Sequence, residues 1–403
     1  MTAFDPHAAT EAFLSAASAA ARLKAIHYTQ GAHWLLLWGW LASVTASVVI
    51  ARSGVLPKLS RAVQAARPRP RLFAFLAVAA FAMMDFIIEA PWTTYAQWWR
   101  EKSYGLTSQA FGGWLGEQAL QALIGAVIAG VAFMGLYSLM RRSPKRWWLW
   151  GGGLVGLFWM VLMVISPILI EPLFNTYTPA PPGPTRDAVV ALARQAGVPS
   201  DKIFVYNGSK QSNRYTANVA GLFGSARVAM SDVMFAKGAD IAEVRGVVGH
   251  EMGHYVRGHV INEAVFYSAI GLLAFFLAMR TFPLVDRWVR TGAVDIADPV
   301  GYPSLIIVVT TLLLILTPLT SFMSRSDETD ADAFSIQYAK EPTGLARALV
   351  KTLEYRADSP GAVEEFLFYD HPSVRRRVQT AMDWKAAHLT EALAQEAADG
   401  VKP

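Results

Sequence analysis

Residues 147–170 read WWLWGGGLVGLFWMVLMVISPILI, and none of these twenty-four positions holds Asp, Glu, Lys or Arg. A helix needs about 20 mainly apolar residues to cross the hydrocarbon core of a bilayer, so this stretch predicts a transmembrane helix. Five other segments approach the same length and are similarly apolar: residues 32–51, 72–91, 118–140, 264–280 and 303–323. The segment 264–280 has the shortest uncharged run, and a shallow or half-buried helix is the alternative for it.

The composition fits a multipass membrane protein with a substantial water-exposed part. Of the 403 residues, 53% are hydrophobic and 17% are charged, against about 25% charged in a soluble domain of average composition. The charges are concentrated between the apolar segments. This pattern excludes a disordered chain, and the absence of cysteine excludes a disulfide scaffold, a thiol enzyme and a zinc finger with cysteine ligands.

The basic residues orient the chain in the membrane. Six Lys or Arg lie in residues 52–71 and four lie in residues 141–146, and neither loop contains an acid. The loop near Arg280, Arg287 and Arg290 lies on the same side if every span crosses. Because basic loops face the cytoplasm, we expect both termini and residues 171–263 on the other side. The net charge of +5 is explained by these loops, so we expect no nucleic-acid partner.

The spans divide the chain into five parts. Residues 1–31 lack the basic start and apolar run of a signal peptide and predict an amphipathic helix on the membrane surface or against the bundle. Residues 32–170 contain four spans, and residues 264–323 form a transmembrane hairpin. The water-exposed parts are residues 171–263 and the polar, helical C-terminal residues 324–403.

Residues 171–263 predict a small α+β unit. A proline-rich linker is followed by a helix capped by Thr185 and ending near Gly197. KIFVY at 202–206 and ARVAMSD at 226–232 predict strands, and the helix after them is expected from about residue 241 to residue 259.

That last helix carries H-E-x-x-H, because His250 and His254 stand at i and i+4 with Glu251 between them. Both imidazoles leave one face of the helix and can share a metal ion, and Glu251 can reach a water bound to it. The alternative is a surface helix with incidental histidines. His259 lies about 140° around a continuous helix from His254, so we expect a solvated or membrane-edge histidine rather than a ligand.

A catalytic zinc site needs a third protein ligand and one open position. Glu328 is the best candidate, and Asp332, one helical turn later, would accept the free N–H of a zinc-bound imidazole. The two spans between the motifs return the chain to the side where His250 lies. The alternative is an acidic helix start that complements the helix dipole.

The chain resembles the Ste24 (CAAX prenyl protease 1) branch of the M48 zinc metallopeptidases. The resemblance covers residues 72–380 and includes these motifs: E-A-P-W at 89–92, I-E-P-L-F-N-T-Y-T-P at 170–179, A-N-V-A-G-L at 217–222, G-H-E-M-G-H-Y at 249–255, S-R-S-D-E-T-D-A-D at 324–332 and D-H-P-S-V-R-R-R at 370–377. It implies a ring of about six transmembrane helices around a water-filled chamber, with a small α+β zinc-metallopeptidase domain at its rim. Asp85 and Glu89, four residues apart in the second span, would then line the chamber.

The resemblance also implies site residues and their roles. One Zn²⁺ per chain would be bound by His250, His254 and Glu328, with Glu251 as general base and Asp332 as the acid that accepts a hydrogen bond from a zinc-bound imidazole. His371 would stabilise the oxyanion, and Arg377 matches the arginine six positions later in the family motif. Asn218 lies in the strand segment where the family binds the substrate backbone. The roles of these three residues rest on the resemblance alone.

Three departures limit the resemblance. Six spans are counted where eukaryotic Ste24 enzymes have seven, Asn175 stands where the eukaryotic pattern usually has Asp, and the charge bias places the active site on the non-cytoplasmic side. The first and third indicate a bacterial branch at the inner membrane, for which a prenylated substrate is not implied. The leading hypothesis is a zinc endopeptidase acting on peptides or proteins.

Two alternatives to that hypothesis stay open. One is an HtpX-like quality-control peptidase with the same ligands and fewer spans, and the other is a non-catalytic zinc-binding membrane scaffold. The polarity of the helix that carries H-E-x-x-H argues against an intramembrane site-2-type protease.

Overall fold

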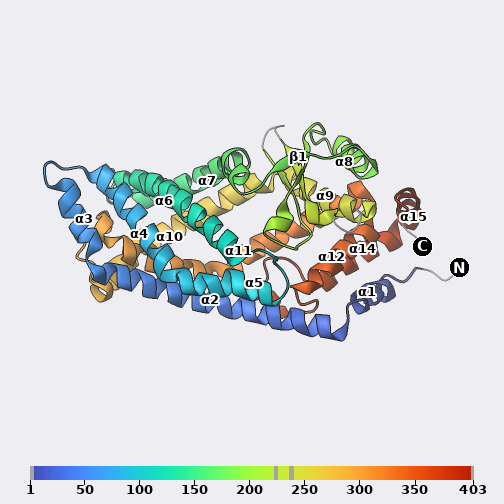
Figure 1. The fold of residues 1–403 in the computed structure, drawn as a ribbon, viewed down its shortest axis with the longest axis horizontal. Coiled ribbons are helices and arrows are strands. Elements are labelled where there is room, and N and C mark those ends of the chain that lie inside the picture. Colours follow the sequence, from blue (N-terminus) through green and yellow to red (C-terminus); the bar gives the residue numbers. More distant parts are fainter. Residues whose placement is uncertain (1–3, 222–225, 236–239, 401–403) are drawn as a thin grey trace.

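The computed structural model describes residues 4–221, 226–235 and 240–400. Six long helices run side by side along the longest axis of the molecule (Figure 1), and each is long and apolar enough to cross a membrane. They are α2 (Ala19–Ser53), α4 (Pro70–Thr93), α6 (Phe111–Arg142), α7 (Trp147–Ile165), α10 (His259–Val289) and α11 (Tyr302–Ala339). The expected multipass helical architecture is confirmed, and the apolar segment 264–280 lies within a full-length helix.

Several of these helices extend well beyond the bilayer. The 38 residues of α11 span about 57 Å at 1.5 Å per residue, whereas the hydrocarbon core is about 30 Å thick. A π-helical turn (Thr94–Trp99) continues α4 into α5 (Arg100–Ser103), and another (Ser166–Ile170) follows α7. The short α3 (Val55–Gln64) lies at the end of the molecule far from both termini (Figure 1).

Small residues allow α7 and α10 to pack closely. A Cβ added at Gly152 would lie 2.4 Å from Leu272 Cγ, and one added at Gly156 would lie 2.0 Å from Ser268 Oγ. Membrane helices associate through close packing of this kind because lipid gives them no hydrophobic driving force to pair.

A four-stranded sheet packs against α8 (Pro184–Gln195) and α9 (Ile241–Val256). Its order is β1 (Tyr177–Pro179), β2 (Ile203–Tyr206), β4 (Arg227–Ser231), β3 (Ala217–Ala220). Only the β2–β4 pair is parallel. The strands at 202–206 and 226–232 were therefore expected correctly, and β3 is an edge strand.

The remaining helices are α1 (Pro6–Ser15), α12 (Pro342–Lys351), α13 (Ala362–Phe368), α14 (Val374–Ala387) and α15 (Leu389–Ala398). Side chains of α8, α9 and β4 form one buried core with Phe334 of α11. A second core joins Leu14 of α1 to α12 and α14. The expected cap at Thr185 is wrong, because Gly183 is the N-cap and Pro184 begins α8.

Candidate metal centre

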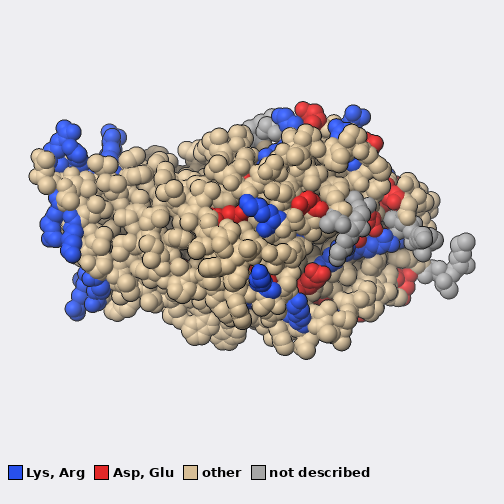
Figure 2. Space-filling model, viewed as in Figure 1, with Lys and Arg blue, Asp and Glu red and all other residues tan. Residues whose placement is uncertain are grey.

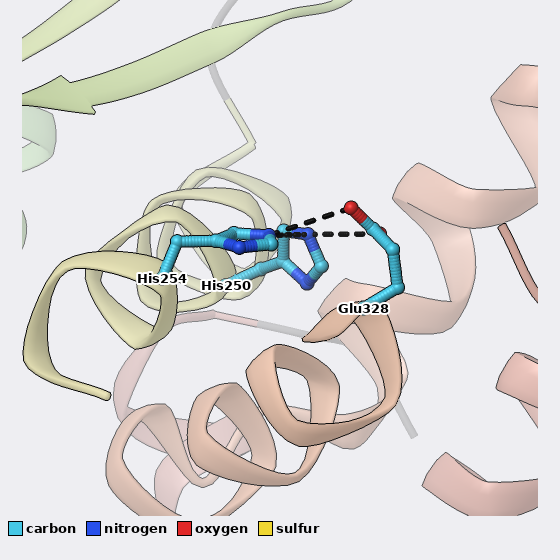
Figure 3. A group of neighbouring side chains, drawn as sticks. All are labelled: His250, His254 and Glu328. Carbon is cyan, nitrogen blue, oxygen red and sulfur yellow. Dashed lines mark hydrogen bonds and ion pairs between the residues drawn. The ribbon is translucent and has the colours of Figure 1, made fainter. Parts of the chain in front are cut away.

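The three expected metal ligands meet between α9 and α11. His250 Nε2 lies 3.2 Å from His254 Nε2 and 3.2 Å from Glu328 Oε2, and His254 Nε2 lies 3.4 Å from Glu328 Oε1. One ligand atom from each residue lies within 4.8 Å of the others. Figure 3 shows the two imidazoles leaving one side of α9 toward the carboxylate on α11.

Small residues on α9 bring α11 this close. A Cβ at Gly253 would lie 3.0 Å from Ala331 Cα, and one at Gly249 would lie 2.9 Å from Ser335 Oγ. Ser335 Oγ also donates a 2.6 Å hydrogen bond to the carbonyl of Gly246. The glycines of the G-H-E-M-G-H sequence therefore allow Glu328, two turns before Ser335, to reach the histidines.

The charges around these ligands favour a cation. Burial alone would lower the pKa of His250, but the carboxylates of Glu328 and Asp332 raise it to about 10. Glu328 Oε2 is buried and accepts no hydrogen bond within the described part of the chain. Two imidazole nitrogens and a carboxylate are ligands that zinc and other transition metals accept, so the donor set fits a metal ion.

Asp332 and Arg377 hold His250 from the other side. Asp332 Oδ1 lies 2.9 Å from His250 Nδ1, and Arg377 donates two 2.7 Å hydrogen bonds to the Asp332 carboxylate. Arg377 Nη1 also lies 3.4 Å from Glu328 Oε2. A hydrogen bond from Nδ1–H to Asp332 leaves His250 Nε2 free as a metal ligand.

His371 completes the ring of side chains around the ligands. It lies in the turn between α13 and α14, and its Nε2 is 3.4 Å from Glu328 Oε1. Its Nδ1 is 2.8 Å from Asp370 Oδ1, which orients the imidazole. Glu251 lines the same cavity of about 170 Å³ as His250, Glu328 and His371, and burial raises the pKa of its carboxyl group.

Asn218 does not line the Glu251 cavity. It belongs to the edge strand β3 and lines, with His254 and the end of α7, a separate cavity of about 230 Å³. Its Oδ1 is buried and has no hydrogen-bond partner among the described residues. The edge strand thus extends from one cavity to the other, because Ala217 lines the Glu251 cavity.

The expectation that His259 is solvated is wrong, whereas nothing contradicts the expectation that it is not a ligand. Gly258 has a φ of +68° and ends α9, so His259 begins α10 and the chain turns back. His259 is only 3% exposed. Its Nδ1 lies 2.9 Å from His254 Nδ1, and its Nε2 lies 3.3 Å from Asp330 Oδ2. It is therefore a buried neighbour of His254, and the glycine before it was the available signal.

Two protein-family models match the sequence of this chain. Residues 183–385 match the model of peptidase family M48, and residues 6–176 match the model of the CAAX prenyl protease N-terminal region, described as five membrane helices. The chain belongs to peptidase family M48. This membrane metalloendopeptidase has four candidate spans in residues 6–176, whereas the family description has five. The other helix at the start of this range, α1, has only 10 residues and is too short to cross a membrane.

Relatives of this M48 peptidase come from bacteria and eukaryotes. It is 29% identical over 348 residues to the Bacillus subtilis metalloprotease YhfN, covering 83% of this chain and 79% of that protein. It is 26% identical over 324 residues to CAAX prenyl protease 1 of Saccharomyces cerevisiae, covering 75% and 70% of the two chains. The crystal structure of S. mikatae Ste24p has a TM-score of 0.76 at 21% identity and covers 92% of this chain and 90% of that one.

Proposed function

We propose that the protein is a zinc-dependent endopeptidase of the Ste24 type, which hydrolyses peptide bonds with Glu251 as general base. The observation that carries this proposal is the convergence of His250, His254 and Glu328 beside a cavity that also exposes Glu251 and His371. A structural metal site would be closed by a fourth protein ligand and would not need a base.

The residues of the chain divide the chemistry between them. His250, His254 and Glu328 would hold a zinc ion, which would supply Lewis-acid chemistry and make a nearby water more acidic. Glu251 takes the proton of the attacking water and gives it to the leaving amine. His371 donates from Nε2 to the oxygen that becomes negative, with Asp370 fixing the imidazole from Nδ1. Asp332 and Arg377 keep His250 oriented.

The edge strand β3 supports a role in holding the substrate. Its partner β4 occupies only one side, with Asn218 paired to Ala229, so an extended peptide can add to the other side. Adding a strand in this way positions a peptide backbone through main-chain hydrogen bonds. The unpartnered Asn218 Oδ1 is an acceptor for a substrate N–H.

Purification followed by metal analysis and a peptide-cleavage assay tests this function. We expect about one zinc per chain, cleavage of quenched fluorescent peptides, and loss of cleavage in Glu251→Ala. Full activity of that variant, or the absence of zinc from active protein, would refute the mechanism. If Glu251→Gln binds zinc and functions normally in cells, the alternative of a non-catalytic zinc-binding membrane scaffold would be favoured instead.

The position of the basic loops supports an active site outside the cytoplasm. Figure 2 shows Lys and Arg gathered at one end, a broad band with few charges next to it, and mixed charges at the other end. The first end contains α3, and the last contains α9, α14 and both termini (Figure 1). By the positive-inside rule, this distribution supports our proposal that the catalytic end lies outside a bacterial inner membrane. Reporter domains fused to the C-terminus, one active only in the cytoplasm and one only outside it, test this orientation.

A further inference from the structure

The direction of β3 orients a bound peptide relative to the two cavities. The cavity with Glu251 touches the start of β3, at Thr216 and Ala217, and the cavity with His254 touches its end, at residues 218–221. Antiparallel pairing is the more stable arrangement per residue. A peptide paired antiparallel to β3 therefore has its N-terminal part in the His254 cavity and its C-terminal part in the Glu251 cavity.

The Glu251 cavity contains the guanidinium of Arg356, which has no carboxylate within ion-pair distance among the described residues, although its charge helps to lower the pKa of the Asp370 carboxyl group. Arg356 lines this cavity and also the larger one beside it, of about 560 Å³. Its Nη2 lies 3.4 Å from His371 Nδ1 and 3.5 Å from His371 Nε2.

The other arginines around the site are already paired. Arg377 binds Asp332 through two hydrogen bonds. Arg214, which lines the larger cavity, lies 2.7 Å from Glu101 Oε2. Arg356 is thus available to bind an anion from the substrate, and its half-buried position makes such a pair stronger than one in open water.

One part of the Glu251 cavity wall is apolar. Val247 of α9 and Leu345, Ala348 and Leu349 of α12 line it. This part of the wall accommodates an apolar side chain directly after the scissile bond, and Arg356, like His371, lines both this cavity and the larger one beside it. The anion should therefore be on a residue further along the leaving fragment.

We propose that Arg356 binds a carboxylate on the C-terminal side of the scissile bond and so determines substrate specificity. The proposal rests on the peptidase function proposed above. The carboxylate has two possible sources, an Asp or Glu side chain and the free C-terminus of a short leaving fragment. A planar guanidinium binds both in the same two-pronged geometry.

The test compares peptides that differ only after the scissile bond. A peptide that the wild-type protein cleaves is made with Asp, Asn or Lys at the second position after that bond, and separately with the chain ending there as a carboxylate or an amide. We expect kcat/KM to be about tenfold higher for a carboxylate form than for its neutral partner, as for a charge-assisted hydrogen bond. A preference for Asp identifies the side chain as the source, and a preference for the free terminus identifies the chain end.

Variants of Arg356 separate binding from folding, because each preference is a ratio measured on one protein preparation. Arg356→Gln should remove the preference, Arg356→Lys should keep part of it, and Arg356→Glu should favour the Lys peptide. Arg347→Gln is the matched control, since Arg347 lies on α12 outside both cavities and pairs with Asp240. It should keep the wild-type ratio.

A second readout does not depend on turnover. Fluorescence anisotropy of the same peptides with zinc-loaded Glu251→Gln, with and without Arg356→Gln, should show about tenfold tighter binding of the carboxylate form only when Arg356 is present. Equal ratios in wild type and Arg356→Gln, or equal affinities in the binding assay, would overturn the proposal. Failure of the wild type to cleave any peptide would count against the peptidase function, and the anisotropy result would still decide the role of Arg356.

Discussion

Asp332→Asn separates the role of this carboxylate in metal binding from its role in stability. Asp332 is 3% exposed, accepts two 2.7 Å hydrogen bonds from Arg377 and lies 2.9 Å from His250 Nδ1. Asparagine keeps nearly the same shape but loses the charge and one acceptor. The substitution therefore tests whether the carboxylate fixes the metal-binding form of His250.

Both effects have an expected size. Loss of a carboxylate that hydrogen-bonds a metal-binding histidine typically weakens metal binding by about 10–100-fold. One charge-assisted hydrogen bond contributes about 1.5–3 kcal/mol, and breaking a buried ion pair costs about 3–5 kcal/mol. Because Glu328 remains 3.4 Å from Arg377 and keeps part of the compensation, we expect the free energy of unfolding to fall by about 2–4 kcal/mol.

Zinc affinity is measured by competition with a chromophoric chelator, and stability by thermal unfolding of the metal-free protein in detergent. The control is Asp383→Asn, because Asp383 is exposed on α14 and its side chain accepts a hydrogen bond from Gln379. Wild-type zinc affinity in Asp332→Asn would refute the reasoning about His250, whatever happens to stability.

Three further predictions concern other parts of the molecule. His259→Ala should weaken zinc binding about tenfold, because it removes the buried neighbour of His254; His259→Asn keeps an acceptor and should restore most of the affinity. Gly156→Ala should destabilise the protein by about 1–3 kcal/mol, because the added Cβ would collide with α10. Gly153→Ala should not destabilise it, because a Cβ there would meet no atom within 4 Å. Equal unfolding temperatures of the two variants would contradict this packing. Burial raises the pKa of Glu341 to about 9. The folded protein therefore keeps a proton that the unfolded chain releases above pH about 4.5. The free energy of unfolding should fall as the pH rises from about 5 to 9. Glu341→Gln should therefore raise the unfolding temperature at pH 8 more than at pH 5.

The spans and the ligand spacing could be predicted from the sequence because each depends on local pattern. Residues 147–170 and the five other apolar segments correspond to long helices, and i, i+4 spacing places His250 and His254 on one face of α9. The ends of the helices could not be predicted in this way. The α2 helix begins at Ala19, because polar residues continue the helix where the bilayer has ended.

Other features depend on where the chain turns and on contacts between distant segments. The 140° separation of His259 from His254 assumed a continuous helix, and the left-handed conformation of Gly258 removes that assumption. Arg356 belongs to no motif. It lines the Glu251 cavity only because α12 and the turn with His371 pack beside α9. The closeness of α9 and α11 follows from glycines whose partners lie about 80 residues away.

The most direct test of the metallopeptidase proposal is the stepwise return of zinc to chelator-treated protein, with bound metal and peptide cleavage followed together. We expect cleavage to rise in proportion to zinc until about one equivalent is bound. Glu251→Gln should bind one equivalent without cleaving, and His250→Ala should bind no zinc at the same concentrations. Cleavage by metal-free protein, or by zinc-loaded Glu251→Gln at the wild-type rate, would contradict the proposed site and mechanism.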